Sequence, residues 1–205
     1  MDKIKIVIIG ENCTDKFIYG SVSRLCPEAP VPILNPYKIT KNPGMAGNVV
    51  ENLKAINKSC EINFITQETE ITKTRFVDEK SNQMIVRVDE GEDHITPLVL
   101  TEPIINKILL SDIVIVSDYN KGFLTESVIE EICNRHGQVF LDTKKVLGTW
   151  AEKAAFIKIN DYEYKRSTPF ITKSISDKLI HTRGSSGCDF RGVNYPVEQI
   201  SVRDT

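Results

Sequence analysis

The chain has 205 residues, of which 40% are hydrophobic and 26% are charged, with a formal net charge of −2. This length supports one sizeable core, and the weak net charge gives no reason to expect nucleic acid or an anionic membrane as a partner. No apolar run is long enough to cross a bilayer, and no signal-peptide pattern opens the sequence. Five scattered cysteines without a Cys-x-x-Cys pair are typical of reduced thiols, so we expect a cytoplasmic protein.

Short apolar runs, each followed by polar residues, predict strands that are buried on both faces. They cover residues 4–9, 113–116, 139–141, 156–159 and 179–180. Helical patterns lie between them, at residues 49–56, 104–109 and 128–132, the last with Thr125 as a plausible N-cap. Strands that alternate with helices predict an α/β fold with a doubly wound, mostly parallel sheet. Ligands bind such sheets at the carboxyl ends of the strands, so we expect one edge to gather Asn12, Asp15, Asp118, Asp142 and Asn160.

A second, smaller sheet is predicted from two segments that break this pattern. Residues 72–78 and 83–89 alternate between apolar and polar side chains around a turn, which indicates a hairpin. The proline-rich segment 17–40 is extended, and together with residues 72–90 it is expected to form a β lid over the site. A hairpin alone is marginally stable, so the lid should pack on ligand, on the body or on a second subunit, which suggests a homodimer through the lid.

Six motifs occur in the order found in ribokinase-type (PfkB) carbohydrate kinases, which this sequence resembles over essentially its whole length. They are Asp15, Gly44-Met-Ala-Gly-Asn48, Asp118-Tyr-Asn-Lys-Gly122, Asp142-Thr-Lys144, Asn160-Asp-Tyr-Glu163 and Thr182-Arg-Gly184. Three further features, Arg24-Leu-Cys-Pro-Glu-Ala-Pro-Val-Pro32, Lys73-Thr-Arg75 and Asp89, resemble the kinase domain of the bifunctional heptose 7-phosphate kinase/adenylyltransferases. The resemblance implies a ribokinase-like fold, with residues 1–205 as part of one kinase domain.

The resemblance implies a set of substrate-binding residues, and the residue types suit that task. A carboxylate accepts sugar hydroxyls, small residues at a helix start let a ligand approach the backbone, and Arg or Lys pairs with phosphate. The residues are Asp15, Gly44, Asn48, Lys73, Arg75, Arg87, Asp118 and Lys121. The alternatives are a solvated loop carboxylate, close helix packing at the glycine and a solvated hairpin face. Met45 stands where relatives usually carry a second glycine, and it adds bulk beside the expected pocket.

A nucleotide side is implied in the same way. Its residues are Asp142, Lys144, Asn160, Glu163, Thr182, Gly184 and Gly187. Asn160 and Glu163 are expected to position Mg²⁺ through water, with ATP as co-substrate. The glycine-flanked turn at residues 182–187 suits an anion nest, and the alternative is an ordinary hairpin turn. Asn160 followed by Glu163 also fits a helix N-cap with an acidic first turn.

The implied activity is transfer of the ATP γ-phosphoryl group to the anomeric hydroxyl of D-glycero-D-manno-heptose 7-phosphate, in ADP-heptose and lipopolysaccharide biosynthesis. The family's general base lies in a Gly-Ala-Gly-Asp motif expected beyond Thr205, so no catalytic residue is assigned here. We expect the C-terminal part of the fold to be absent and the chain alone to have little kinase activity. Alternatives are a non-catalytic sugar-phosphate-binding protein and half of a split kinase completed by a second polypeptide. A Rossmann protein is disfavoured because Gly10-Glu-Asn-Cys13 is not Gly-x-Gly-x-x-Gly.

Overall fold

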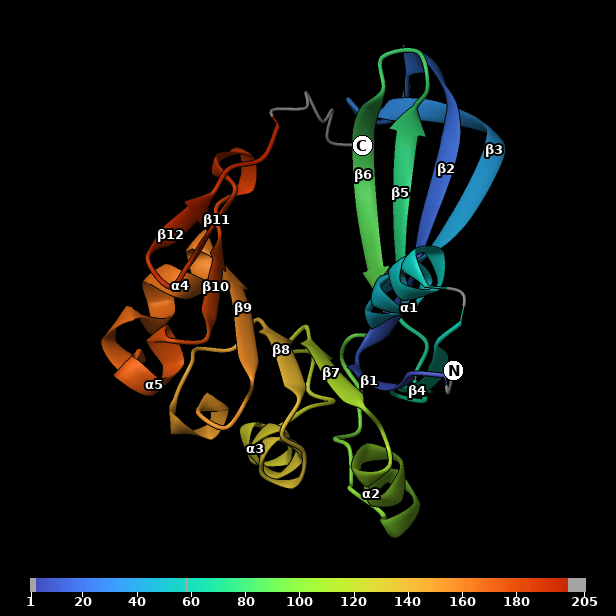
Figure 1. Ribbon diagram of the computed structural model, residues 1–205. Helices are drawn as coiled ribbons and strands as arrows, with labels where there is room; N and C mark the ends of the chain where they lie inside the picture. Colours follow the sequence, from blue (N-terminus) through green and yellow to red (C-terminus); the bar gives the residue numbers. More distant parts are fainter. Residues whose placement is uncertain (1–2, 58, 199–205) are drawn as a thin grey trace.

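The computed structural model describes residues 3–57 and 59–198, which form two β-sheets and the helices around them (Figure 1). The main sheet has the strand order β12-β11-β10-β9-β8-β7-β1-β4. Its parallel strands are β1 (Lys5–Gly10), β4 (Glu61–Ile65), β7 (Ile113–Asp118), β8 (Val139–Thr143), β9 (Phe156–Asn160) and β10 (Leu179–Thr182). The antiparallel strands β11 (Cys188–Phe190) and β12 (Val193–Tyr195) complete it. The predicted doubly wound, mostly parallel sheet is confirmed.

Helices lie on both faces of this sheet around β1 and β7, which explains why these two strands are apolar along most of their length. In β1, Ile6 and Ile8 pack against α1, whereas Val7 and Ile9 join the larger core on the opposite face. The α-helices are α1 (Ala46–Ile56), α2 (Glu102–Leu109), α3 (Glu126–Arg135), α4 (Asp161–Ser167) and α5 (Lys173–Ser176). Three short 3₁₀ turns lie at Thr149–Ala151, Thr168–Phe170 and Gly184–Ser186. The predicted N-cap of α3 is confirmed, since the Thr125 hydroxyl accepts a hydrogen bond from the Val128 N–H.

The second sheet is the lid, with the strand order β3-β2-β5-β6. Its strands are β2 (Asn12–Leu25), β3 (Pro32–Met45), β5 (Thr72–Asp78) and β6 (Gln83–Glu90), and the β5–β6 hairpin agrees with the sequence prediction. The lid is longer than the predicted segment 17–40, because β1 continues almost directly into β2 and pairing with β3 extends down to Met45. In Figure 1 the lid stands at one end of the main sheet, beside β1 and α1.

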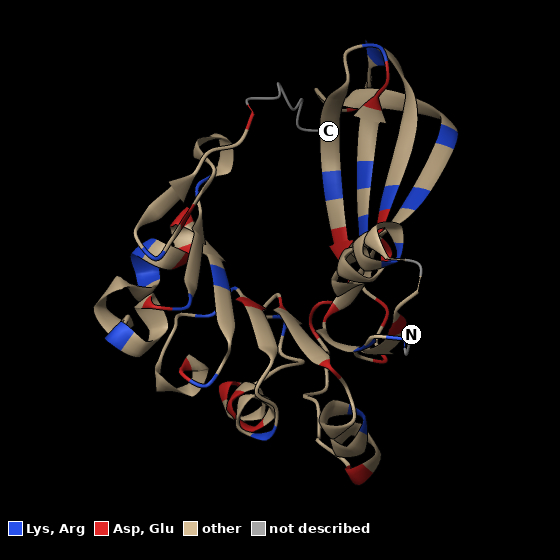
Figure 2. Ribbon diagram, in the orientation of Figure 1, with Lys and Arg blue, Asp and Glu red and all other residues tan. Residues whose placement is uncertain are grey.

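The two faces of the lid differ in character. The register aligns Phe17 with Arg75 and Arg75 with Arg87, so polar and charged side chains share the face that meets the body. The opposite face carries an apolar row that runs from Ile39 to Val86, which are 58% and 49% exposed, with Lys16 and Lys41 in the row beside it. Figure 2 shows the Lys and Arg residues as bands across the lid strands. The lid therefore offers charge on one side and uncovered apolar surface on the other.

Strands β4, β11 and β12 were not anticipated from the sequence. Strand β4 carries Asn63 among its apolar residues, and β11 and β12 have three residues each, too few to show a period. Within residues 3–57 and 59–198, no helix has both the length and the apolar character needed to cross a membrane.

Candidate functional site

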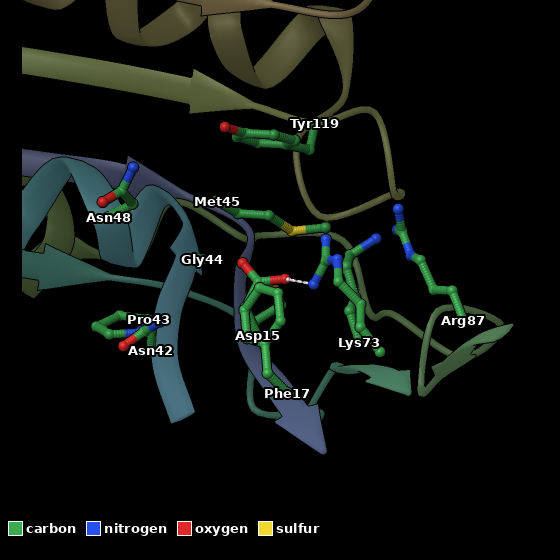
Figure 3. Close-up of a pocket in the computed structure, with 12 residues that line it drawn as sticks. Asp15, Phe17, Asn42, Pro43, Gly44, Met45, Asn48, Lys73, Arg87 and Tyr119 are labelled. Atoms are coloured by element: carbon green, nitrogen blue, oxygen red, sulfur yellow. Dashed lines mark hydrogen bonds and ion pairs between the residues drawn. The ribbon is translucent and has the colours of Figure 1, made fainter. Parts of the chain in front are cut away.

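A pocket of about 540 Å³ lies at the base of the lid, where β2, β3, β5 and the start of α1 meet the loop after β7 (Figure 3). Its lining residues are Cys13, Asp15, Phe17, Asn42, Pro43, Gly44, Met45, Asn48, Lys73, Arg75, Arg87 and Tyr119. Six of the eight predicted substrate-binding residues are therefore together in one cavity. Tyr119 and Asn42, which sequence reasoning did not assign, also line it.

Asp15 is the carboxylate of this pocket. Its Oδ1 atom lies 2.5 Å from Nη1 of Arg75 on the neighbouring strand β5. Its Oδ2 atom faces Gly44, where a Cβ would come within 2.2 Å of it. A side chain at position 44 would displace the Asp15 carboxylate, so the glycine lets this carboxylate keep its position in the pocket. The helix predicted to open at Gly44 in fact begins at Ala46, because Gly44 and Met45 still pair with β2.

Three cations line the pocket, and each has a carboxylate partner. Arg87 binds Asp89 through two hydrogen bonds of 2.7 and 2.8 Å, which holds the pKa of that carboxyl below its usual range. Lys73 donates to Glu92 at 2.6 Å and approaches Asp89 at 3.4 Å. The lysine is buried, so it depends on these carboxylates for compensation of its charge. This set of cations provides ammonium and guanidinium donors for an anionic ligand.

Asp118 and Lys121 are not among the pocket residues. Asp118 is buried and accepts hydrogen bonds from Lys145 Nζ and the Asn120 N–H, each at 3.0 Å. Lys121 instead pairs with Glu92, which links the loop after β7 to Lys73 of the lid. In this structure Asp118 organises the loop after β7, and substrate contact by either residue stays a prediction.

Sequence reasoning missed Glu11, which fixes one wall of the pocket. Its buried carboxylate accepts hydrogen bonds from the backbone N–H groups of Tyr119 at 2.8 Å, Lys121 at 3.1 Å and Phe123 at 3.3 Å. Burial raises the pKa of Glu11, and the hydrogen bonds from the Tyr119 and Lys121 N–H groups act in the opposite direction. The only local signal was an acidic residue directly after a buried strand, which does not reveal partners more than 100 residues away.

A second pocket of about 650 Å³ lies beyond the ends of β9 and β10. It is lined by Asn160, Asp161, Tyr162, Thr182, Gly184, Gly187, Cys188 and Val197, which include four of the predicted nucleotide-binding residues. Gly187 has φ 84°, and a Cβ there would lie 2.0 Å from the carbonyl oxygen of Tyr195. The turn needs glycine because it packs closely on the chain's own backbone at Tyr195, and contact of this turn with a nucleotide stays a prediction.

Asn160 and Glu163 form a complete capping box at the start of α4. The Asn160 Oδ1 atom accepts from the N–H groups of Tyr162 and Glu163, and Glu163 Oε2 accepts from the Asn160 N–H at 2.6 Å. The other Glu163 oxygen receives Lys144 Nζ at 3.0 Å. Both carboxylate oxygens are thus engaged, so a magnesium ion would meet these two residues through water and take direct ligands elsewhere. The described residues contain no cluster of three or more His, Cys, Asp or Glu residues suited to a metal.

Lys144 lies between the two pockets. While its Nζ atom pairs with Glu163 next to the second pocket, it also lies 5.6 Å from the ring centre of Tyr119, which lines the first. The two side chains of this ion pair differ in exposure, since Lys144 is 41% exposed and Glu163 is 3% exposed. Asp142 pairs with Lys158 at 2.9 Å and lines neither pocket. Lys144 therefore lies close to one residue on each side, and its contact with a nucleotide phosphate stays a prediction.

Comparisons with known proteins agree with this architecture, although no family model matches the chain. It is 30% identical to the bifunctional protein HldE of Nitratiruptor sp., over 85% of this chain and 44% of that protein. It is 36% identical to HldE of Helicobacter pylori strain J99, over 67% of this chain and 36% of that protein. Among solved structures, a carbohydrate kinase from Agrobacterium tumefaciens superposes with a TM-score of 0.62 at 14% identity, covering 92% of this chain and 73% of that chain. A ribokinase from Thermotoga maritima superposes with a TM-score of 0.59 at 12% identity, covering 98% and 80%.

The parallel sheet and the lid define a ribokinase-like fold. The chain belongs to the ribokinase-like family, and HldE proteins are among its sequence relatives. It spans less than half of the length of these curated relatives.

Proposed function

We propose that this chain binds a phosphorylated sugar at the base of the lid, as the substrate-binding part of a ribokinase-type kinase. One observation carries the proposal: Asp15 lies in the same pocket as Lys73, Arg75 and Arg87. The carboxylate suits sugar hydroxyls, and the two guanidinium groups suit the oxygens of a phosphate. The sugar would reach Asp15 through its Oδ2 side, because Oδ1 already binds Arg75.

The substrate we propose is D-glycero-D-manno-heptose 7-phosphate, phosphorylated at its anomeric hydroxyl on the route to ADP-heptose and lipopolysaccharide. The relationship to HldE proteins and the cationic pocket support this choice over an uncharged sugar. The free cysteines are compatible with a reducing compartment, and we propose a cytoplasmic location.

ATP is proposed to bind at the second pocket, with its phosphates over the turn that holds Gly184 and Gly187. Mg²⁺, when bound with ATP, would neutralise charge on the phosphate oxygens. The chain's own contribution is Lys144, whose ammonium group lies between Tyr119 of the sugar pocket and Glu163 of the nucleotide side. A cation at this position would stabilise the negative charge of a phosphoryl group in transfer.

The alternative is a non-catalytic sugar-phosphate-binding protein, or one half of a kinase completed by a second polypeptide. Titration calorimetry with heptose 7-phosphate and with Mg-ATP separates these functions. Binding of both ligands supports a kinase, whereas binding of the sugar phosphate alone supports the non-catalytic alternative. Asp15→Asn is expected to weaken sugar binding at least ~10-fold. Arg135→Ala, on the far helix α3, is the control and should leave binding unchanged. Equal binding by all three proteins would count against the proposed site.

A second copy of the chain is the partner we propose for the outer face of the lid. Ile39 on β3 and Val86 and Val88 on β6 are 58%, 49% and 40% exposed, and Ile18 and Phe76 of the two central strands connect Ile39 to Val86 across the same face. Pairing two such faces would remove this surface from water.

A further inference from the structure

Met45 has a backbone conformation that favours glycine. Its φ and ψ angles are 50° and −131°, in a region that Cβ-bearing residues rarely adopt. The other described non-glycine residues with positive φ are Asn82, Asn120 and Arg191. Asparagine tolerates positive φ comparatively well, but an unbranched apolar side chain has no such compensation. The chain therefore retains a strained methionine at a position where glycine would be relaxed.

The surrounding structure fixes this conformation from both sides. Met45 is the last residue of β3 and pairs with Asn12 of β2. Directly after it, the Ala46 N–H donates to the carbonyl oxygen of Glu11 at 2.9 Å, and α1 begins. Asn12 is in turn held by hydrogen bonds of 3.0 and 2.7 Å with Gln67. The backbone at Met45 cannot relax without breaking the strand pairing or the start of the helix.

The side chain held in this way faces the sugar pocket. It is buried against Cys13 and Ile71, and Tyr119 packs against the same small cluster. Figure 3 shows the Met45 thioether extending between Asp15 on one side and the ring of Tyr119 on the other. Met45 consequently occupies space that a ligand bound to Asp15 would otherwise fill.

We propose that Met45 is a specificity-determining residue that limits the length of the sugar phosphate accepted between Asp15 and Tyr119. This rests on the proposed sugar-phosphate site and adds to it the residue that sets chain-length selectivity. Backbone strain of this kind persists at ligand sites where the surrounding structure over-determines it. Met45→Ala removes the side chain beyond Cβ, so it should increase the affinity for a sugar phosphate that is longer by one hydroxymethylene group relative to the shorter one. Met45→Gly removes Cβ as well, so it should also relieve the backbone strain of the positive φ.

The binding test compares Met45→Gly and Met45→Ala with the wild-type chain, using calorimetry with mannose 6-phosphate and with heptose 7-phosphate. Both variants should shift the ratio of the two dissociation constants at least ~10-fold toward the heptose, since one methylene-sized contact gives about that discrimination. Met84→Ala is the matched control, because Met84 is exposed on the lid and lies outside the pocket. A ratio within about threefold of wild type, or a shift toward the hexose, would overturn the role of Met45.

Thermal unfolding tests the backbone argument without any ligand. Met45→Gly should melt about 2–6 °C higher than Met45→Ala, because only glycine relieves the positive φ. An alanine variant that is equally or more stable would overturn the claim of strain. The two proposals fail differently in the binding experiment. A wild-type chain that binds neither sugar phosphate overturns the proposed function, whereas normal binding with an unchanged ratio overturns only the inference about Met45.

Discussion

The Oε2 atom of Glu11 accepts a hydrogen bond from the backbone N–H of Tyr119 at 2.8 Å, although 108 residues separate them in the chain. The other oxygen of Glu11 accepts from Lys121 and Phe123, so one buried carboxylate holds the whole loop after β7. Because Tyr119 lines the proposed sugar pocket, the shape of that pocket depends on Glu11, which does not line it.

Glu11 should make the stability of the chain depend on pH. Its folded pKa is raised above the ordinary value of 4.5 by burial. At a pH between 4.5 and the folded pKa, Glu11 is protonated more often in the folded state than in the unfolded state. Its contribution to stability therefore rises as the pH falls through the folded pKa toward 4.5. Urea unfolding from about pH 8 to about pH 5 should show wild type gaining stability relative to Glu11→Gln. A stability difference that is flat or opposite in slope would contradict the assignment.

Arg87 should contribute to affinity for the phosphate and not for the sugar. Arg87→Ala is expected to weaken binding of heptose 7-phosphate about 10- to 100-fold, the loss expected for one charge-assisted hydrogen-bonding group. Binding of free heptose, which lacks the phosphate, should change little. Calorimetry with both ligands gives the answer, and Arg135→Ala serves as the control. Equal losses for the two ligands would place Arg87 against the sugar instead.

Asn160 combines a helix cap with a proposed role at the nucleotide, and two substitutions separate these roles. Asn160→Ser keeps a good N-cap, so its stability should stay near wild type, whereas Asn160→Ala should lose about 1 kcal/mol. If Asn160 also contacts the nucleotide site, both variants should bind Mg-ATP more weakly. Unfolding and binding measurements on the same samples test this. Normal ATP binding by the serine variant would leave Asn160 as a cap only.

The five cysteines should fall into two classes of reactivity. Burial raises the pKa of Cys13 to about 11 and that of Cys133 to about 12, so neither thiolate is populated near neutral pH. Cys26, Cys60 and Cys188 are only partly buried. Ellman's reagent should therefore titrate three thiols quickly in the folded chain and all five after unfolding. Rapid reaction of five thiols in the folded chain would show that the buried surroundings of Cys13 and Cys133 open readily to the reagent.

The outer face of the lid should hold two copies of the chain together. Val86→Lys places a charge in the apolar row of this surface, so it should convert a dimer to a monomer in sedimentation velocity experiments. Val99→Lys is a matched control, since Val99 is 72% exposed but lies outside the lid. A wild-type chain that remains monomeric at high concentration would rule out this interface.

Most of the body and the outline of the site could be predicted from local patterns. Uninterrupted apolar runs predicted β1 and β7, and the alternation of apolar and polar residues predicted the β5–β6 hairpin. Thr125 correctly marked the start of α3. Such patterns depend on residues a few positions apart, which share one helix face or one strand. The lid boundaries were less accurate, because the length of β2 is set by its pairing with β3.

The sequence by itself determined the kinds of element and the chemical groups available, including a carboxylate and several cations near the strand ends. Only the tertiary structure decided which of them meet: Asp15 with Arg75, Glu11 with the loop after β7, and Lys144 between the two pockets. It also decided that Met45 takes a positive φ. The physical reason is that strand register and packing fix contacts across tens of residues, and no local period carries that information.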